Sequence, residues 1–217
     1  MLLVMLAALP SFGTEMIDRI VATVNGHIIL QSDWDDALCY EAFVAGHPLD
    51  KVTASDRKDS LDRLIDQELL REQIRITDTN LPSEQRVEDR LTDIRKSYPA
   101  ADTDQKWQAL LAKYDLTPPE LRSHVVHELE LLRLVQSRLR PSVQIDPKSI
   151  ESYYNEELLP QLRQEHAKEL PLAEVTPQIR ELLTEQKVNQ LLTAWLQTLR
   201  AGSEIHSQVY TPNNPTQ

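Results

Sequence analysis

The sequence of 217 residues predicts a mainly α, multi-helix domain with a small antiparallel β-sheet formed by an N-terminal hairpin and a C-terminal strand. First, apolar residues recur at three- and four-residue steps along most of the chain, as in amphipathic helices. Second, Asn25-Gly26 separates two apolar runs within Ile17 to Leu30, which is typical of a two-residue hairpin turn. Third, Ile205 to Val209 alternates like a strand. Because a lone strand leaves backbone groups unpaired, we expect this strand to pair with the hairpin.

Capping residues and helix breakers place the helices. We expect Ser32 to cap the first helix, with Asp35 three residues later in a capping-box position, and Gly46 to end it. The sequence Thr117-Pro118-Pro119-Glu120 is a complete N-terminal signature, because it combines a cap, proline at the first position and glutamate at the third. The expected helices lie at about 33–44, from 53–55 to the break at 80–82, at 83–98, from 104, at 121–139, from 147 and at 174–200.

The composition excludes several kinds of function. Hydrophobic residues make up 41% and charged residues 26%, which is ordinary for a globular domain. The net charge of −11 argues against binding to nucleic-acid phosphates. Only four glycines occur, so no glycine-rich phosphate loop can be built. The single Cys39 cannot form an intramolecular disulfide, and its helical pattern predicts a buried thiol.

The first 13 residues indicate export. Leu2 to Leu9 is an apolar run that is too short to span a bilayer, which needs about 20 residues. The small residues Ser11 and Gly13 follow it at the positions that precede a signal-peptide cleavage site. The basic segment that normally precedes such a run is missing, since no Lys or Arg occurs before Arg19. The alternative is an N-terminal helix that packs on the domain.

Few residues suggest chemistry. His124 and His127 are spaced to share a helix face, but a metal site needs three or four ligands, so a partly solvated face is the simpler interpretation. Asp33, Asp35 and Asp36 suit a helix N-terminus, where the helix dipole favours negative charge. We find no nucleophile motif and predict no catalytic residue, no metal ligand and no cofactor.

Three segments of the chain carry a resemblance to a known family. They are 18–32, which includes DRIVATVNG, 61–70, which reads LDRLIDQELL, and 171–205, which begins PLAEVTPQIR and continues through Trp195 to Ile205. Together they resemble the SurA-like family of periplasmic chaperones. The resemblance covers about 17–155 and 171–210. In the family, one or more parvulin isomerase domains of about a hundred residues lie between the second and third segments. Here only about fifteen residues separate Asn155 from Leu170, so the resemblance implies a chaperone body without its isomerase domain.

The resemblance and the leader together predict the organisation of the chain. We expect a signal peptide at 1–13, an N-terminal helical chaperone region at 14–158 and a short linker at 159–173 that replaces the parvulin domain. A C-terminal helix and strand at 174–210 would pack back on the N-terminal region, and 211–217 would form a disordered tail.

The implied function is that of an ATP-independent periplasmic holdase, which binds unfolded outer-membrane proteins without isomerase activity and without stable membrane insertion. The alternatives are a peptidyl-prolyl cis-trans isomerase and an adaptor for one fixed partner in the cell envelope. A homodimer remains an open alternative. A groove for unfolded chains needs exposed apolar and aromatic side chains, although each tryptophan also suits a helical core. The aromatic candidates for peptide binding are Trp34, Trp107, Tyr114, Tyr153 and Tyr154.

Overall fold

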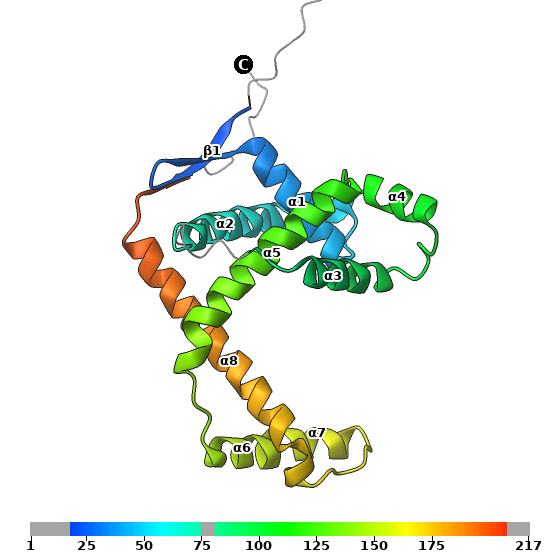
Figure 1. Cartoon of the computed structure of the whole chain (residues 1–217), viewed down its shortest axis with the longest axis vertical. Helices are drawn as coiled ribbons and strands as arrows, with labels where there is room; N and C mark the ends of the chain where they lie inside the picture. Colours follow the sequence, from blue (N-terminus) through cyan, green and yellow to red (C-terminus); the bar gives the residue numbers. More distant parts are fainter. Residues whose placement is uncertain (1–17, 75–80, 208–217) are drawn as a thin grey trace, which may run out of the picture.

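We describe the protein from a computed structural model, which covers residues 18–74 and 81–207. The expectations for 1–13, 208–209 and 211–217 lie outside these residues. The fold is mainly α with one three-stranded antiparallel sheet, as predicted (Figure 1). The elements are β1 Ile20–Val24, β2 His27–Leu30, α1 Gln31–Ala45, η1 Leu49–Lys51, α2 Ala54–Arg71, α3 Glu84–Lys96, α4 Asp104–Ala112, α5 Pro118–Leu139, η3 Arg140–Ser142, α6 Pro147–Tyr153, the π-helical η4 Tyr154–Leu158, α7 Leu159–Gln164, α8 Leu172–Ala201 and β3 Ile205–Ser207.

The sheet joins the two ends of the described chain. β1 lies in the middle, with β2 on one side and β3 on the other, and both pairings are antiparallel. Asn25 and Gly26 have positive φ angles of 49° and 88°, which a type I′ turn requires at both central positions. Val24 is paired with His27 across the turn and with Ile205 on the other side. The predicted pairing of the C-terminal strand with the hairpin is therefore confirmed for Ile205–Ser207.

The start of α1 differs from the expectation. Ser32 is not the cap, because β2 runs directly into the helix and Leu30 occupies the N-cap position. The Asp33 carboxylate accepts a hydrogen bond of 2.9 Å from the Leu30 backbone N–H. The Ser32 hydroxyl instead donates to the carboxylate of Asp18. Because no loop follows β2, α1 begins two residues earlier than the sequence pattern suggested.

Five other helices, α2 to α6, begin with a side-chain cap. Thr53, Ser83, Thr103, Thr117 and Asp146 each accept a backbone hydrogen bond from the residue three positions later. Such a bond satisfies one of the free N–H groups of the first helical turn.

The sheet and helices α1 to α5, which we call the body, contain two adjoining cores. In one, Phe43 is fully buried and stacks on Tyr98, with ring centroids 5.0 Å apart, while Trp107 and Tyr114 meet its ring edge-on. In the other, the buried face of the sheet packs on α1 and α2. These two cores bury Trp34, Phe43, Trp107 and Tyr114.

Helix α8 links the body to a distal lobe, which contains α6, η4 and α7. Its C-terminal part packs against α2 and α5, and the Arg200 Nε donates to Asp66 at 2.6 Å. Val188 of α8 is buried in a cluster with Leu70 of α2 and Val135 of α5, and the Arg138 guanidinium lies 4.7 Å from the Trp195 ring centroid. Together, α5 and α8 form a stalk that leads down to α6 and α7 (Figure 1).

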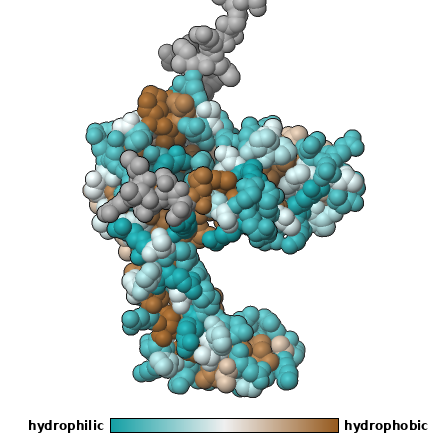
Figure 2. Space-filling view, viewed as in Figure 1, coloured by the Kyte–Doolittle hydropathy of each residue, from teal (hydrophilic) through white to brown (hydrophobic). Residues whose placement is uncertain are grey.

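The distal lobe occupies most of the stretch that was expected to be a linker. Ile150, Val175 and Ile179 form its small core, and Tyr153, Tyr154, Leu158 and Leu172 pack around them. The expected linker 159–173 therefore contains α7 and the beginning of α8, and only 165–171 lie outside helices. Figure 2 shows an open hollow between this lobe and the body, with apolar surface in separate patches over the sheet and along the stalk.

A groove between the hairpin and helices α1, α2 and α5

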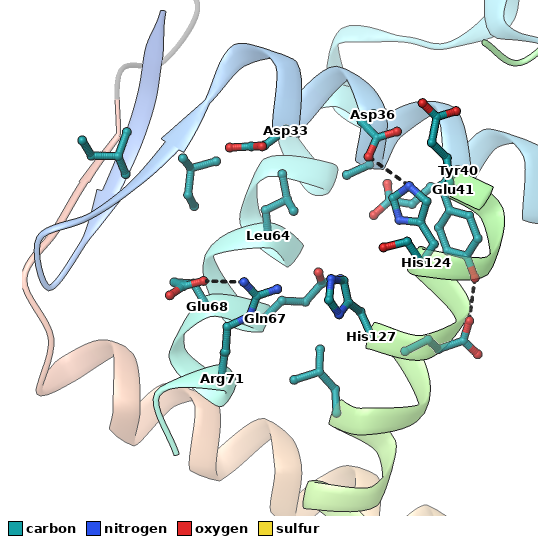
Figure 3. A pocket seen from close by; sticks show the side chains of 17 residues that line it. Asp33, Asp36, Tyr40, Glu41, Leu64, Gln67, Glu68, Arg71, His124 and His127 are labelled. Carbon is teal, nitrogen blue, oxygen red and sulfur yellow. Dashed lines mark hydrogen bonds and ion pairs between the residues drawn. The ribbon is translucent and has the colours of Figure 1, made fainter. Parts of the chain in front are cut away.

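A groove of about 530 Å³ opens in the body where β2, α1, α2 and α5 meet. This volume lies in the range of known ligand sites and is too small for a folded domain. Each helix contributes side chains at the spacing of one helical face (Figure 3). The lining residues are Ile28 and Ile29 from β2, Asp33, Asp36, Ala37, Tyr40 and Glu41 from α1, Leu64, Gln67, Glu68 and Arg71 from α2, and Glu120, Ser123, His124, His127, Glu128 and Leu131 from α5.

The wall between α1 and α5 is a fixed polar network. The rings of Tyr40 and His124 stack with centroids 4.4 Å apart, and His124 Nε2 lies 3.0 Å from an Asp36 oxygen (Figure 3). The Tyr40 hydroxyl donates to Glu128 at 2.7 Å, and Arg90 donates to the other oxygen of the same carboxylate. Burial, together with the Glu128 carboxylate, raises the pKa of Tyr40 far above its usual range, so its hydroxyl stays a proton donor.

The wall near the hairpin is less completely paired. Glu68 on α2 has a side chain that is only 17% exposed. Its partners are distant, with His27 Nδ1 at 3.6 Å and Arg71 at 3.8 Å, and no hydrogen bond joins it to another described side chain. A carboxylate can accept several hydrogen bonds, so Glu68 retains acceptor capacity on the groove side.

The groove lining combines apolar and negatively charged side chains. Ile28 is 56% exposed at its edge, and Leu64 and Leu131 are partly buried within it. Carboxylates outnumber the fixed cations, because Arg71 is the one arginine or lysine among the lining residues. Arg63 and Arg90 approach from outside and neutralise Glu41 and Glu128 respectively, which leaves an acidic excess. The groove therefore suits a ligand that is partly apolar and partly cationic.

The aromatic candidates do not form one site. Trp34 is 4% exposed, and its indole N–H donates to the Arg57 carbonyl, while Trp107 and Tyr114 belong to the core around Phe43. These three side chains offer a peptide almost no surface. Trp34 and Trp107 are core residues, which was the alternative role that the sequence allowed for each tryptophan. Tyr153 and Tyr154 are partly buried in the distal lobe, where the Tyr154 hydroxyl donates to the Leu170 carbonyl.

The histidines and aspartates singled out in the sequence have different partners. His124 contacts Asp36, whereas the exposed His127 lies 3.4 Å from Glu130. Asp33 caps α1 and Asp35 pairs with Arg57. Within 18–74 and 81–207, no three His, Cys, Asp or Glu side chains are grouped to hold a metal ion.

Cys39 is half-buried, not fully buried as expected. Desolvation, followed by the charges of Asp115, Asp35 and Asp36, raises the pKa of its thiol. A raised pKa favours the unreactive thiol over the nucleophilic thiolate.

No protein-family model matches the chain, and no curated protein matches it significantly. The similarity to SurA-like chaperones therefore rests on the three sequence segments alone. In the described ranges, no helix is both long and apolar enough to cross a bilayer.

The groove was missed from the sequence although one signal was present. On α5, Glu120, Ser123, His124 and His127 recur at three- and four-residue steps opposite a buried apolar stripe. Such a polar face is ordinarily solvated, and only the packing of α1 and α2 beside it makes it a groove wall.

Proposed function

We propose that this chain is an ATP-independent periplasmic holdase that binds unfolded outer-membrane proteins and has no isomerase activity. The observation that carries the proposal is the groove between β2, α1, α2 and α5. It combines the exposed Ile28 and the partly buried Leu64 and Leu131 with polar groups, and it lies beside an outer strand of the sheet. A shallow surface of this kind suits an extended, partly apolar chain.

The groove also fits weak and transient binding. Its walls are held by folded helices, while its volume admits only a few side chains at a time. Outer-membrane strands alternate apolar and polar residues, so an unfolded client offers many short segments of suitable character. A holdase needs this kind of repeated, low-affinity contact, because the client must later be released without ATP.

The connection of the two ends supports the SurA-like interpretation. Strand β3 pairs with β1, and α8 packs along α2, so the C-terminal segment completes the N-terminal body. The third segment of the resemblance, which includes α8 and Ile205, therefore packs on the other two. Between Tyr154 and Leu172 the chain forms the η4 and α7 helical segments of the distal lobe.

An aggregation assay tests the proposal. A denatured outer-membrane protein is diluted with and without the purified chain, and light scattering is recorded. We expect scattering to fall as the concentration of the chain approaches that of the client. Several unrelated clients should each show this decrease. Absence of protection at excess chain would contradict the holdase proposal, and protection of a single client would favour the adaptor.

The isomerase alternative has its own assay. A protease-coupled measurement of prolyl isomerisation should give the uncatalysed rate with the purified chain, since X–Pro isomerisation without a catalyst takes tens to hundreds of seconds. A rate that increases in proportion to chain concentration would contradict the proposal that this protein acts only as a chaperone.

A further inference from the structure

Resting on the proposed function, we propose that the groove selects extended client segments in which Lys or Arg alternates with apolar residues, and that Glu68 receives the cationic side chain. This proposal names the class of segment that the holdase binds. It is carried by the geometry of β2, the incomplete pairing of Glu68 and the charge of the groove.

The free edge of β2 gives the bound segment a register. Among the described strands, β2 has β1 as its one neighbour. In an antiparallel ladder, hydrogen-bonded pairs alternate with pairs whose backbone groups point outward. Because Val24 and His27 flank the two-residue turn and form a hydrogen-bonded pair, the N–H and carbonyl of Ile28 point outward. An extended segment can therefore pair with the backbone of Ile28.

The two faces of such an added strand meet different chemistry. Successive side chains on β2 point to opposite faces, so His27 and Ile28 face opposite ways. Glu68 lies on the His27 side, at 3.6 Å from its ring, while Ile28 is exposed on the other side. A bound segment with the same alternation would place a basic side chain towards Glu68 and its apolar neighbours beside Ile28.

The charge of the groove favours a cationic segment over an acidic peptide or a second copy of this chain. The Glu68 carboxylate is mostly shielded from water, so an ion pair there is stronger than one on the open surface. Arg71 competes for this carboxylate from 3.8 Å, with a side chain that is 59% exposed and can move away (Figure 3). A second copy of this acidic chain, or an acidic peptide, would meet like charge.

Fluorescence anisotropy with labelled extended peptides tests this inference. Three peptides share alternating valines and differ in the intervening residues, which are Lys, Gln or Glu. We expect the Lys peptide to bind about tenfold tighter than the Glu peptide at low salt, with a smaller ratio at high salt. Equal affinities for the three peptides would overturn the inference, as would tighter binding of the Glu peptide.

Charge variants of the full chain test whether the preference for the Lys peptide over the Glu peptide arises in the groove. Glu68→Gln should reduce the ratio to about threefold or less, because an uncharged amide replaces the partly buried carboxylate. Glu156→Gln makes the same change on the exposed surface of the distal lobe and should leave the ratio unchanged. Arg71→Gln removes the competing cation and should tighten the Lys peptide, which provides a second test if Glu68→Gln fails to fold. Identical ratios in Glu68→Gln and Glu156→Gln would contradict the role of Glu68.

The aggregation assay separates the two proposals. Suppression of client aggregation without a charge preference would leave the holdase proposal standing and overturn the charge-selective groove. A Lys preference that disappears in Glu68→Gln, without any suppression, would support the groove as a peptide site and contradict the holdase.

Discussion

Asn25 and Glu204 are joined by a reciprocal pair of hydrogen bonds that connects the N-terminal turn to the C-terminal segment. The Asn25 backbone N–H donates to the Glu204 carbonyl at 2.8 Å, and the Glu204 N–H donates to the Asn25 side-chain oxygen at 2.9 Å. The Asn25 amide also donates to Glu72 at 2.7 Å and to the Ser203 hydroxyl at 3.2 Å. One side chain therefore ties the hairpin, the end of α2 and the approach to β3 together.

Substitution of Asn25 should destabilise the chain through two separable effects. Asn25→Ala loses the side-chain hydrogen bonds and places alanine at φ 49°. This left-handed angle costs alanine about 1–2 kcal/mol, whereas asparagine tolerates it better. Asn25→Gly loses the same bonds but tolerates the angle. Chemical denaturation should show both variants to be less stable than the parent, with Asn25→Ala lower by about 1 kcal/mol than Asn25→Gly. Equal stability of all three chains would show that neither the angle nor the bonds matter.

Ser60 should be a site where a simple substitution stabilises the protein. Its side chain is fully buried in α2, and its hydroxyl has no hydrogen-bond partner among the described residues. Ser60→Ala removes the unsatisfied group and adds helix propensity, so thermal or chemical denaturation should show a gain of about 1 kcal/mol. Ser137→Ala is the control, because the Ser137 hydroxyl donates to the Leu134 carbonyl in an exposed turn of α5. A loss of stability in Ser60→Ala alone would reveal an undetected partner of the hydroxyl.

The helix caps should make stability fall on the acid side. Hydrogen bonds from Thr53 and Thr117 lower the pKa values of Asp56 and Glu120. Because each folded pKa lies below the unfolded one, each carboxylate stabilises the fold above its unfolded pKa, near 4, and loses that effect as pH falls through the folded pKa. Denaturation between about pH 6 and pH 2 should show this decline.

Single substitutions test this assignment without removing the caps. Glu120→Gln retains an oxygen acceptor but no longer titrates, so its stability should depend less steeply on acid pH than that of the parent. Glu156→Gln, whose carboxylate lies on the exposed distal lobe, should follow the parent curve. A Glu120→Gln curve that is parallel to the parent throughout would contradict the role of the cap.

Local signals in the sequence predicted much of the fold because the interactions that decide them are local. Asn25-Gly26 fixes the hairpin, and the side chains of Ser83 and Thr117 bond to backbone groups three residues away. The expectation was wrong where a distant contact competes. The Ser32 hydroxyl donates to Asp18, and Leu30 takes the N-cap position that was expected for Ser32.

The candidate site was beyond local reasoning for a similar reason. The groove depends on the packing of α1, α2 and α5, and its walls come from residues as distant as Ile28 and Leu131. The sequence directed attention to aromatic residues, but Trp107 and Tyr114 are used by the core. The residues now in question, Ile28 and Glu68, are an ordinary strand residue and an ordinary helix carboxylate when each is considered alone.

Ile28 provides a test of client binding with little effect on the fold. Its side chain is 56% exposed on β2, so Ile28→Thr keeps β-branching and a strand-compatible shape while reducing apolar surface. We expect the free energy of unfolding to change by less than about 0.5 kcal/mol, as for most surface substitutions. In the light-scattering assay, suppression of client aggregation should weaken several-fold. The matched control is Leu81→Thr, which removes apolar surface from a side chain that is 70% exposed before α3 and outside the groove. Equal loss of suppression in both variants would show that general surface hydrophobicity, and not the groove edge, holds the client.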